Sequence, residues 1–253
     1  AEVVKTMANT LVHRGPDDGG VWVDKNASLA LGHCRLAILD LSHEGHQPML
    51  SKDGHYAMVF NGEIYNHPEL RVTLEKESAN CGPIDWRGHS DTETLLECFS
   101  RWGVRKTLEL SVGMFAIALW DMRERKLCLA RDRFGEKPLY YGWVDGAFVF
   151  GSELKALRRY PSFSNQVDRN VLSLYMRYCY VPTPYSIYQN IFKLEPGCLL
   201  TITADSLSNP PTSVPTAPMR AGNFILDRWW SLESVVSDGT KSQITDEREA
   251  MDL

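Results

Sequence analysis

The residues best suited to chemistry lie in the stretch Asn61-Gly62-Glu63, directly after the apolar, β-prone run from Tyr56 to Phe60. Asn-Gly between apolar runs favours a two-residue hairpin turn, because both residues tolerate positive φ angles. The same pair could instead hold an oxyanion, because the Asn side chain and the Gly backbone each offer an N–H donor. Turns far outnumber oxyanion holes, so the pair alone leaves both interpretations open.

Three charged residues extend this pattern. Arg35 interrupts an apolar run, where a guanidinium group is costly to bury unless it pairs with an anion. Glu63 follows the Asn-Gly pair, and Asp91 lies in the first turn of an expected helix. One cation, two carboxylates and two N–H donors would suit a zwitterionic amino acid whose side-chain carbonyl is attacked. Alternatively, Arg35 forms a structural ion pair with Glu63 or Asp91, and the spacing does not exclude this.

No side chain stands out as the nucleophile. Cys34 neighbours His33 on an expected strand, where adjacent side chains point to opposite faces. A triad of Cys81, His89 and Asp91 can be drawn, but nothing places these groups within hydrogen-bond reach. The chain also lacks a P-loop and a G-x-G-x-x-G fingerprint, so we expect no nucleotide site in it.

Composition excludes several classes of function. The 253 residues carry a net charge of -5, which argues against a nucleic-acid partner. The longest apolar runs, such as Met114 to Trp120, are too short to cross a membrane, and no apolar signal segment opens the chain. The scattered cysteines form no C-x-x-C pair, which favours reduced thiols in a cytoplasmic protein; we expect no metal site.

These residues must be positioned by helices packed on antiparallel sheets. The spacing of apolar residues predicts where the helices and strands lie. Helices are expected over residues 2–11, 68–77, 90–103 and 168–178. Ser90 and Glu93 form an S-x-x-E capping box at the start of the third helix, which Gly103 is expected to end. Strands are expected over residues 21–23, 29–39, 55–60 and 198–203, with four more between 112 and 152 joined by short turns.

Seven motifs then occur in a specific order. They are His13–Asp17, Arg35–Asp40, Phe60–Asn66, Ser90–Glu93, Gly113–Ala116, Arg131–Tyr141 and Ser152–Leu157. Together they closely resemble the glutaminase domain of glutamine-hydrolysing asparagine synthetases, a class II glutamine amidotransferase domain. The resemblance covers most of residues 1–203 and implies an α+β fold of the N-terminal-nucleophile hydrolase type, an αββα sandwich with two antiparallel sheets between helices.

The resemblance also implies roles for particular residues. Asn61 would give its side-chain N–H and Gly62 its backbone N–H to the oxyanion hole. Arg35 would hold the α-carboxylate of glutamine, and Glu63 and Asp91 its α-amino group. The backbone from Leu36 to Ile38 would line the pocket, whose wall includes the loop from Arg14 to Asp17. The implied glutamine-binding set is therefore Arg35, Leu36, Ile38, Asn61, Gly62, Glu63 and Asp91.

The implied reaction converts L-glutamine into glutamate and ammonia, and the ammonia then amidates aspartate in asparagine biosynthesis. The family's nucleophile is a Cys exposed at the N-terminus when Met is removed. Because this chain has no counterpart of it, we expect that the chain lacks its beginning and hydrolyses nothing as given. The alternatives are an amidotransferase for another carboxylate, such as a sugar acid, and a non-catalytic domain that binds glutamine.

Three segments are expected on this basis. Residues 1–203 would be the glutaminase domain, 204–223 a linker or flexible loop, and 224–253 the start of a synthetase domain. We expect no cofactor in this chain, since ATP and Mg²⁺ would act in the remainder of the synthetase domain. That domain is the expected partner, and a homodimer is compatible with the resemblance.

Overall fold

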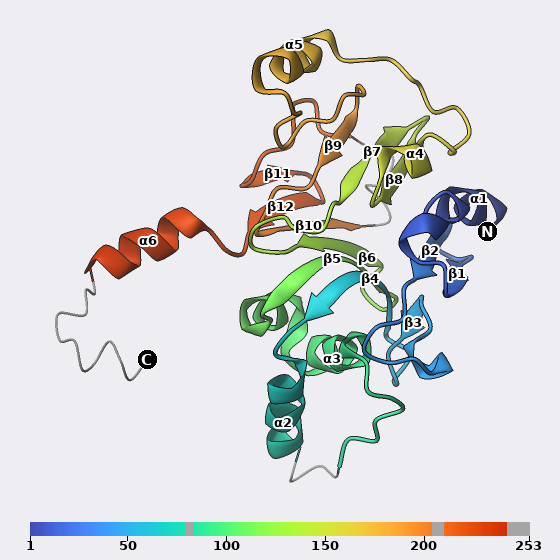
Figure 1. The fold of residues 1–253 in the computed structure, drawn as a ribbon, viewed down its shortest axis with the longest axis vertical. Helices are drawn as coiled ribbons and strands as arrows, with labels where there is room; N and C mark the ends of the chain where they lie inside the picture. Colours follow the sequence, from blue (N-terminus) through green and yellow to red (C-terminus); the bar gives the residue numbers. More distant parts are fainter. Residues whose placement is uncertain (79–82, 204–209, 242–253) are drawn as a thin grey trace.

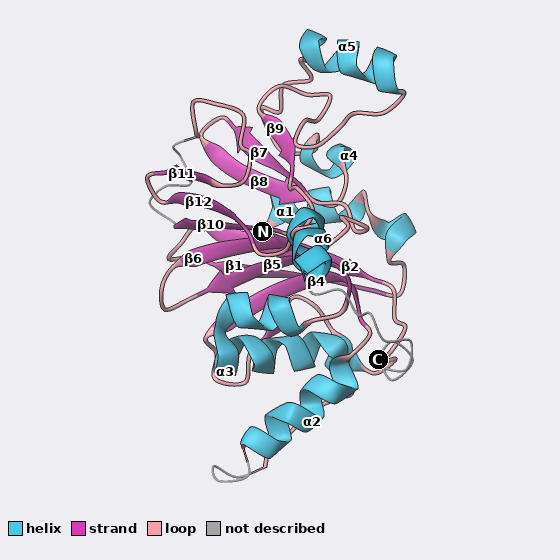
Figure 2. Ribbon diagram, turned by 90° about the vertical axis from the view of Figure 1, so that its left-hand side faces the viewer, coloured by secondary structure: helices cyan, strands magenta, loops and turns pink. Residues whose placement is uncertain are grey.

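The chain folds into four layers (Figures 1 and 2). The computed structural model describes residues 1–78, 83–203 and 210–241. Helices α2 (His67–Glu77) and α3 (Asp91–Leu110) cover one face of a seven-stranded sheet, whose other face packs on two smaller sheets. Helices α1 (Glu2–Asn9) and α4 (Leu154–Leu157) lie on the outer side of the smaller sheets. The predicted αββα sandwich is therefore confirmed.

All strand pairs are antiparallel. In spatial order, the seven-stranded sheet consists of β11 (Met219–Ala221), β12 (Phe224–Arg228), β10 (Cys198–Thr203), β6 (Lys126–Arg131), β5 (Gly113–Asp121), β4 (Tyr56–Ile64) and β3 (Met49–Leu50). The smaller sheets are the pair β1 (Asp18–Asp24) and β2 (Leu29–Arg35), and the triplet β8 (Ala147–Gly151), β7 (Tyr140–Val144) and β9 (Ile191–Lys193). Two short 3-10 helices span Val12–Arg14 and His43–Gly45.

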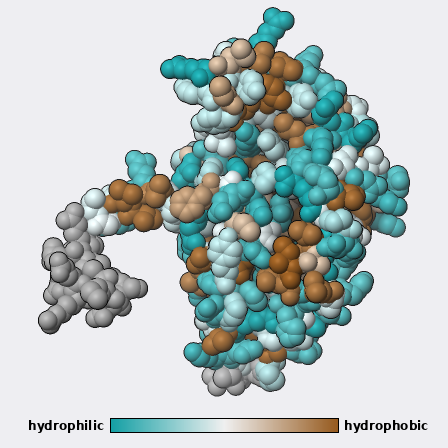
Figure 3. All heavy atoms as spheres, viewed as in Figure 1, coloured by the Kyte–Doolittle hydropathy of each residue, from teal (hydrophilic) through white to brown (hydrophobic). Residues whose placement is uncertain are grey.

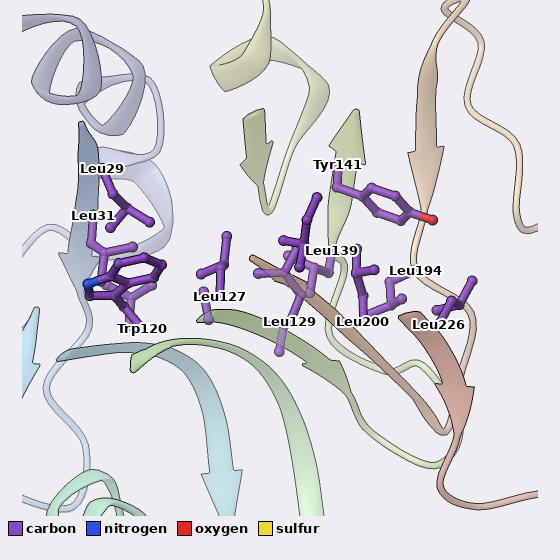
Figure 4. Close-up of a cluster of buried hydrophobic side chains, with 14 of the residues drawn as sticks. Leu29, Leu31, Trp120, Leu127, Leu129, Leu139, Tyr141, Leu194, Leu200 and Leu226 are labelled. Atoms are coloured by element: carbon purple, nitrogen blue, oxygen red, sulfur yellow. The ribbon is translucent and has the colours of Figure 1, made fainter. Parts of the chain in front are cut away.

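Two apolar cores separate these layers, and β4 contributes to both. Ala57 and Val59 point into the core between the sheets, whose leucines and aromatic residues are drawn in Figure 4. Met58 and Phe60 point into the core beneath α2 and α3. Because side chains alternate along a strand, Asn61 lies on the inter-sheet face of β4.

The Asn61–Gly62 pair is not a hairpin turn, so that interpretation is wrong. Strand β4 continues through the pair to Ile64 and stays paired with β5 as far as Gly113. The expected strand over 29–39 is also too long, since β2 ends at Arg35. Pairing with β5 outweighs the local turn preference of Asn-Gly, because each paired residue gains ladder hydrogen bonds and buried contacts.

Three predicted helix boundaries, at Ser90, Gly103 and Asp168, agree with the structure. Ser90 accepts a hydrogen bond from the Glu93 N–H (3.2 Å), which confirms the predicted start of α3. The predicted end at Gly103 is confirmed, because the backbone leaves the helical conformation there (φ 76°, ψ 171°), and a second helical segment then continues to Leu110. Asp168 caps α5 (Arg169–Tyr178) by accepting hydrogen bonds from two backbone N–H groups.

The chain returns to the seven-stranded sheet after the proline-rich segment. Strand β12 pairs with β10, and the buried Trp229 ring stacks on Phe115 with 6.0 Å between ring centroids. Helix α6 (Leu232–Lys241) then projects from the body and exposes Leu232, Val235 and Val236 (Figures 1 and 3). Residues 224–229 thus pack with the sandwich, while the predicted boundaries at 203 and 223 stay predictions.

The fully buried carboxylate of Asp132 fixes the loop that follows β6. Its two oxygens accept hydrogen bonds from the N–H groups of Phe115, Phe134, Glu136 and Lys137, at 2.9 to 3.1 Å. The neighbouring Arg131 guanidinium donates to three backbone carbonyls of the same region. This side-chain pair therefore joins the loop to β5, the strand opposite Asn61 and Gly62.

We predict that Asp132→Ala lowers the free energy of unfolding by at least about 3 kcal/mol, because buried N–H groups lose a charged acceptor. Urea denaturation of the chain measures the change. Asp85→Ala is the matched control, since the Asp85 side chain is 85% exposed and pairs only with Lys52 at the surface. Equal unfolding free energies for the two variants would contradict the prediction.

Candidate active site

One cavity of about 590 Å³ contains the predicted site. Helix α1 and strands β2, β4, β5 and β8 all contribute residues to its lining, including the part of β4 around Asn61. All seven residues of the predicted glutamine-binding set border it: Arg35, Leu36, Ile38, Asn61, Gly62, Glu63 and Asp91. The structure therefore brings the set together, while the roles of its members stay predictions.

The outer edge of β4 presents one backbone donor to this cavity. The Phe60 N–H donates to the Gln47 side chain (2.7 Å), and the Ile64 N–H donates to an Asp91 carboxylate oxygen (3.0 Å). Peptide groups alternate in direction along an antiparallel ladder, so the Gly62 N–H points to the same edge. Within the described residues this N–H has no hydrogen-bond partner, which leaves it available to a ligand.

Residue 62 must be glycine because of β5, and not because of its φ angle. A Cβ atom at this position would overlap the Met114 carbonyl oxygen on the neighbouring strand. Gly62 is absent from the residues with positive φ. The Asn61 side chain beside it is half-buried and likewise makes no hydrogen bond within the described part of the chain. Two unpaired donors on consecutive residues could therefore bind one oxygen atom.

Arg35 is buried at the end of β2, where its guanidinium group supports a loop. It donates to the backbone carbonyls of Ser42 (2.9 Å) and Asp40. Gly45 makes room for it, since a Cβ there would overlap the guanidinium group. The alternative ion pair with Glu63 or Asp91 is not among the salt bridges of the described residues. With five N–H donors and two contacts of this kind, the group can also bind an anion.

Two carboxylates that border the cavity, those of Glu63 and Asp91, interact electrostatically. Burial raises the pKa of Asp91, and the negative charge of Glu63 raises it further. Hydrogen bonds from backbone N–H groups and the nearby His67 act in the opposite direction. An ammonium group bound between the two carboxylates would remove the repulsion and favour their charged forms. The pair is thus suited to an amino group.

Sequence reasoning missed two residues that contact β4, the buried Gln47 and the half-buried His33. The Phe60 carbonyl accepts hydrogen bonds from His33 Nε2 (3.0 Å) and Gln47 Nε2 (3.3 Å). Burial lowers the pKa of His33 to about 4, so the imidazole is neutral at pH 7 and its Nε2 carries the proton that is donated. Neither residue carries a local signal, because both contacts join segments that are distant in sequence.

The described cysteines do not supply a nucleophile to Asn61 and Gly62. Cys34 borders the cavity, but its Sγ donates to the Ala8 carbonyl (3.1 Å), and burial raises the pKa of the thiol. A raised pKa disfavours the reactive thiolate. Cys81, from the triad considered above, lies outside the described residues. The other described cysteines are free, and none of them borders the cavity.

Further charged residues lie at the cavity wall. Arg14, which was predicted to belong to this wall, borders the cavity and pairs with Glu153. Although burial acts in the opposite direction, hydrogen bonds from Arg14, Lys155 and His13 lower the pKa of Glu153 to about 2. Glu153 therefore stays ionised and ties the loop after α1 to the start of α4.

The described residues contain no cluster of three or more His, Cys, Asp or Glu side chains that could hold a metal ion. Among their helices, none combines the length and hydropathy needed to cross a lipid bilayer.

The fold is that of a glutamine amidotransferase domain of the N-terminal-nucleophile hydrolase type. The structure aligns with glutamine phosphoribosylpyrophosphate amidotransferase from Bacillus subtilis at a TM-score of 0.60 and 20% identity, over 91% of this chain and 47% of that one. The sequence profile of the glutamine amidotransferase domain matches residues 1–212. The chain therefore belongs to the glutamine amidotransferase domain family.

Two relatives from Bacillus subtilis are named as glutamine-hydrolysing asparagine synthetases. Asparagine synthetase 1 is 37% identical over 204 residues, which is 81% of this chain and 31% of the relative. Asparagine synthetase 3 is 36% identical over 215 residues, which is 82% of this chain and 33% of the relative. The chain thus spans about a third of the length of the curated relatives that it matches.

We predict that His33 makes stability depend on pH. The unfolded chain binds a proton at His33 below about pH 6.5, while the folded chain does so only below about pH 4. The free energy of unfolding should therefore fall as pH decreases from 6.5 to 4, by on the order of 3 kcal/mol from this residue. Urea denaturation at several pH values should show a shallower dependence for His33→Gln. An unchanged pH dependence in the variant would contradict the prediction.

Proposed function

We propose that this chain is the glutaminase part of an amidotransferase and that it binds L-glutamine in the cavity beside β4. The observation that carries the proposal is the pair of N–H donors on Asn61 and Gly62, which have no partner among the described residues and lie in the same cavity as a buried guanidinium group and two carboxylates. The α-carboxylate of glutamine would pair with Arg35. The α-ammonium group would lie between Glu63 and Asp91, and the side-chain amide would point toward Asn61.

The arrangement suits attack on an amide by a thiol. As the thiolate adds to the amide carbon, negative charge develops on the carbonyl oxygen, where the Asn61 and Gly62 N–H groups would stabilise it. The tetrahedral intermediate expels ammonia and leaves a thioester, which water hydrolyses to glutamate and the free thiol. A preorganised pair of donors stabilises this charge without reorganisation during the reaction.

The shape of the cavity indicates how the thiol would reach this position. Strands β2 and β8 both border the cavity, and within the described residues each is paired along one edge, with β1 and β7 respectively. A further β-strand lying between them could pair with both edges and join the two smaller sheets. We propose that a strand from a longer form of the protein lies there and presents a Cys to Asn61 and Gly62.

The longer protein would use the ammonia in a second reaction. The names of the relatives support a glutamine-hydrolysing asparagine synthetase. In this proposal, residues 1–203 are the glutaminase domain, and an ATP-dependent synthetase domain starts after the 204–223 segment. ATP and Mg²⁺ would bind in that domain and not in this chain. The synthetase domain would also select the acceptor carboxylate, so aspartate as the acceptor is a proposal for the whole protein. The homodimer is likewise a proposal for the whole protein.

Two measurements test this proposal. Calorimetric titration of the chain should show binding of L-glutamine and none of D-glutamine, whose ammonium and carboxylate groups are interchanged in space. In addition, a longer form with Cys directly after the initiator Met should release ammonia from L-glutamine. Binding without ammonia release would support a non-catalytic glutamine-binding domain, and absence of both would overturn the proposal.

For the longer form we predict that Asp91→Asn raises KM for glutamine about 100-fold, because the ammonium group loses one buried carboxylate partner. Synthesis driven by added ammonia should be unchanged, since ammonia bypasses the glutamine site. Asp85→Asn is the control, because it removes an exposed carboxylate outside the cavity. Equal loss of the two activities would count against the role of Asp91 in binding glutamine.

A further inference from the structure

The buried side chain of Gln47 replaces a neighbouring strand at one point on the edge of β4. Strand β3 pairs with β4 only at Met58 and Ala57. Two residues further along, the Gln47 carboxamide accepts a hydrogen bond from the Phe60 N–H (2.7 Å) and donates one to the Phe60 carbonyl (3.3 Å). These are the two hydrogen bonds that a paired strand would make with this residue.

The same carboxamide also contacts the helix that carries Asp91. Gln47 Nε2 lies 3.5 Å from Thr92 Oγ1, in the first turn of α3. An amide nitrogen carries two hydrogens, so it can donate to Thr92 and to the Phe60 carbonyl together. One side chain, only 5% exposed, therefore joins the strand that carries Asn61 to the helix that carries Asp91.

A side chain can hydrogen bond with a single peptide group on a strand edge, whereas a paired strand bonds with every outward-facing one. A paired strand would hydrogen bond with each outward peptide group in turn, and would occupy the Gly62 N–H. Gln47 pairs with Phe60 alone, and Asp91 pairs with the Ile64 N–H. The Gly62 peptide between these two fixed points stays unpaired within the described residues, although both of its neighbours on this edge are held.

We propose that Gln47 is a positioning residue for amide hydrolysis: its carboxamide fixes the Phe60 peptide so that Asn61 Nδ2 and the Gly62 N–H converge on the amide oxygen of glutamine. This inference rests on the proposed function. Gln47 borders the cavity, but its carboxamide is already hydrogen bonded to Phe60 and Thr92. It acts by fixing the position of β4, and it leaves the Gly62 N–H, the backbone donor used in the proposed reaction, without a partner among the described residues.

Kinetics of the longer, thiol-bearing form test this role. Gln47→Leu has a similar volume but no hydrogen-bonding groups, and it should lower kcat for glutamine hydrolysis about 10- to 100-fold, because small displacements of catalytic donors cost about this much. KM for glutamine should change less than about threefold, since Arg35, Glu63 and Asp91 are intact. Gln47→Glu keeps the acceptor for the Phe60 N–H and should lie between the parent and Gln47→Leu.

A second readout separates positioning from a general structural effect. L-Glutamate γ-semialdehyde adds the thiol to form a tetrahedral adduct, whose oxygen requires the same two donors. Its inhibition constant should rise by the factor by which kcat/KM falls. Ammonia-driven synthesis should be unchanged and serves as the check that the variants fold. Gln166→Leu, at an exposed glutamine, should match the parent in every assay.

The possible results are distinguishable. Unchanged kcat in both Gln47 variants, or a change in KM alone, would overturn the positioning role while glutamine hydrolysis by the parent upholds the proposed function. A parent that releases no ammonia would overturn the proposed function and this inference with it. If Gln47→Leu fails to fold, Gln47→Glu decides, because its kcat must still fall while its ammonia-driven activity persists.

Discussion

The structure depends on how the edge of β4 is satisfied inside the protein. Buried peptide groups without partners are costly, so a strand edge away from water needs hydrogen bonds along its whole length. Here β3 supplies them at first, then Gln47 and His33 at Phe60, and then Asp91 at Ile64. The Gly62 N–H faces the cavity instead of a partner. The candidate site therefore lies where the hydrogen bonding along this edge is interrupted, between Phe60 and Ile64.

The neighbouring strand sets a second constraint on the same residues. Close approach of β5 excludes a side chain at Gly62, and a Cβ at Gly113 would overlap the Glu63 carbonyl in the same way. Strand β5 is held in turn by Asp132, which accepts the Phe115 N–H, and by Trp229, which stacks on the Phe115 ring. The geometry of two small donors therefore depends on a buried carboxylate and an aromatic ring on other elements.

Features encoded locally could be predicted from the sequence. The capping box at Ser90, the helix start at Asp168 and the hairpins between residues 112 and 152 depend on residues a few positions apart. Features that depend on contacts between distant segments could not be predicted from the sequence. Asn61-Gly62 has turn-forming residues, yet pairing with β5 keeps it extended. Gly103 interrupts the helix as predicted, but the helical segment that follows it to Leu110 was not expected. The members of the candidate site were identified by their motifs, whereas Gln47 and His33 have roles that only their contacts with Phe60 disclose.

The carboxylate pair of Glu63 and Asp91 has a consequence for solution behaviour. Because burial and the Glu63 charge raise the pKa of Asp91, this group takes up a proton more readily than an ordinary aspartate. An ammonium ligand that binds to the ionised form lowers the pKa again, so binding must release protons over the range in which Asp91 titrates. Reciprocally, acidification weakens binding. If glutamine binds as proposed, hydrogen ions and its amino group would compete for this carboxylate, and the heat of binding would vary with the ionisation enthalpy of the buffer.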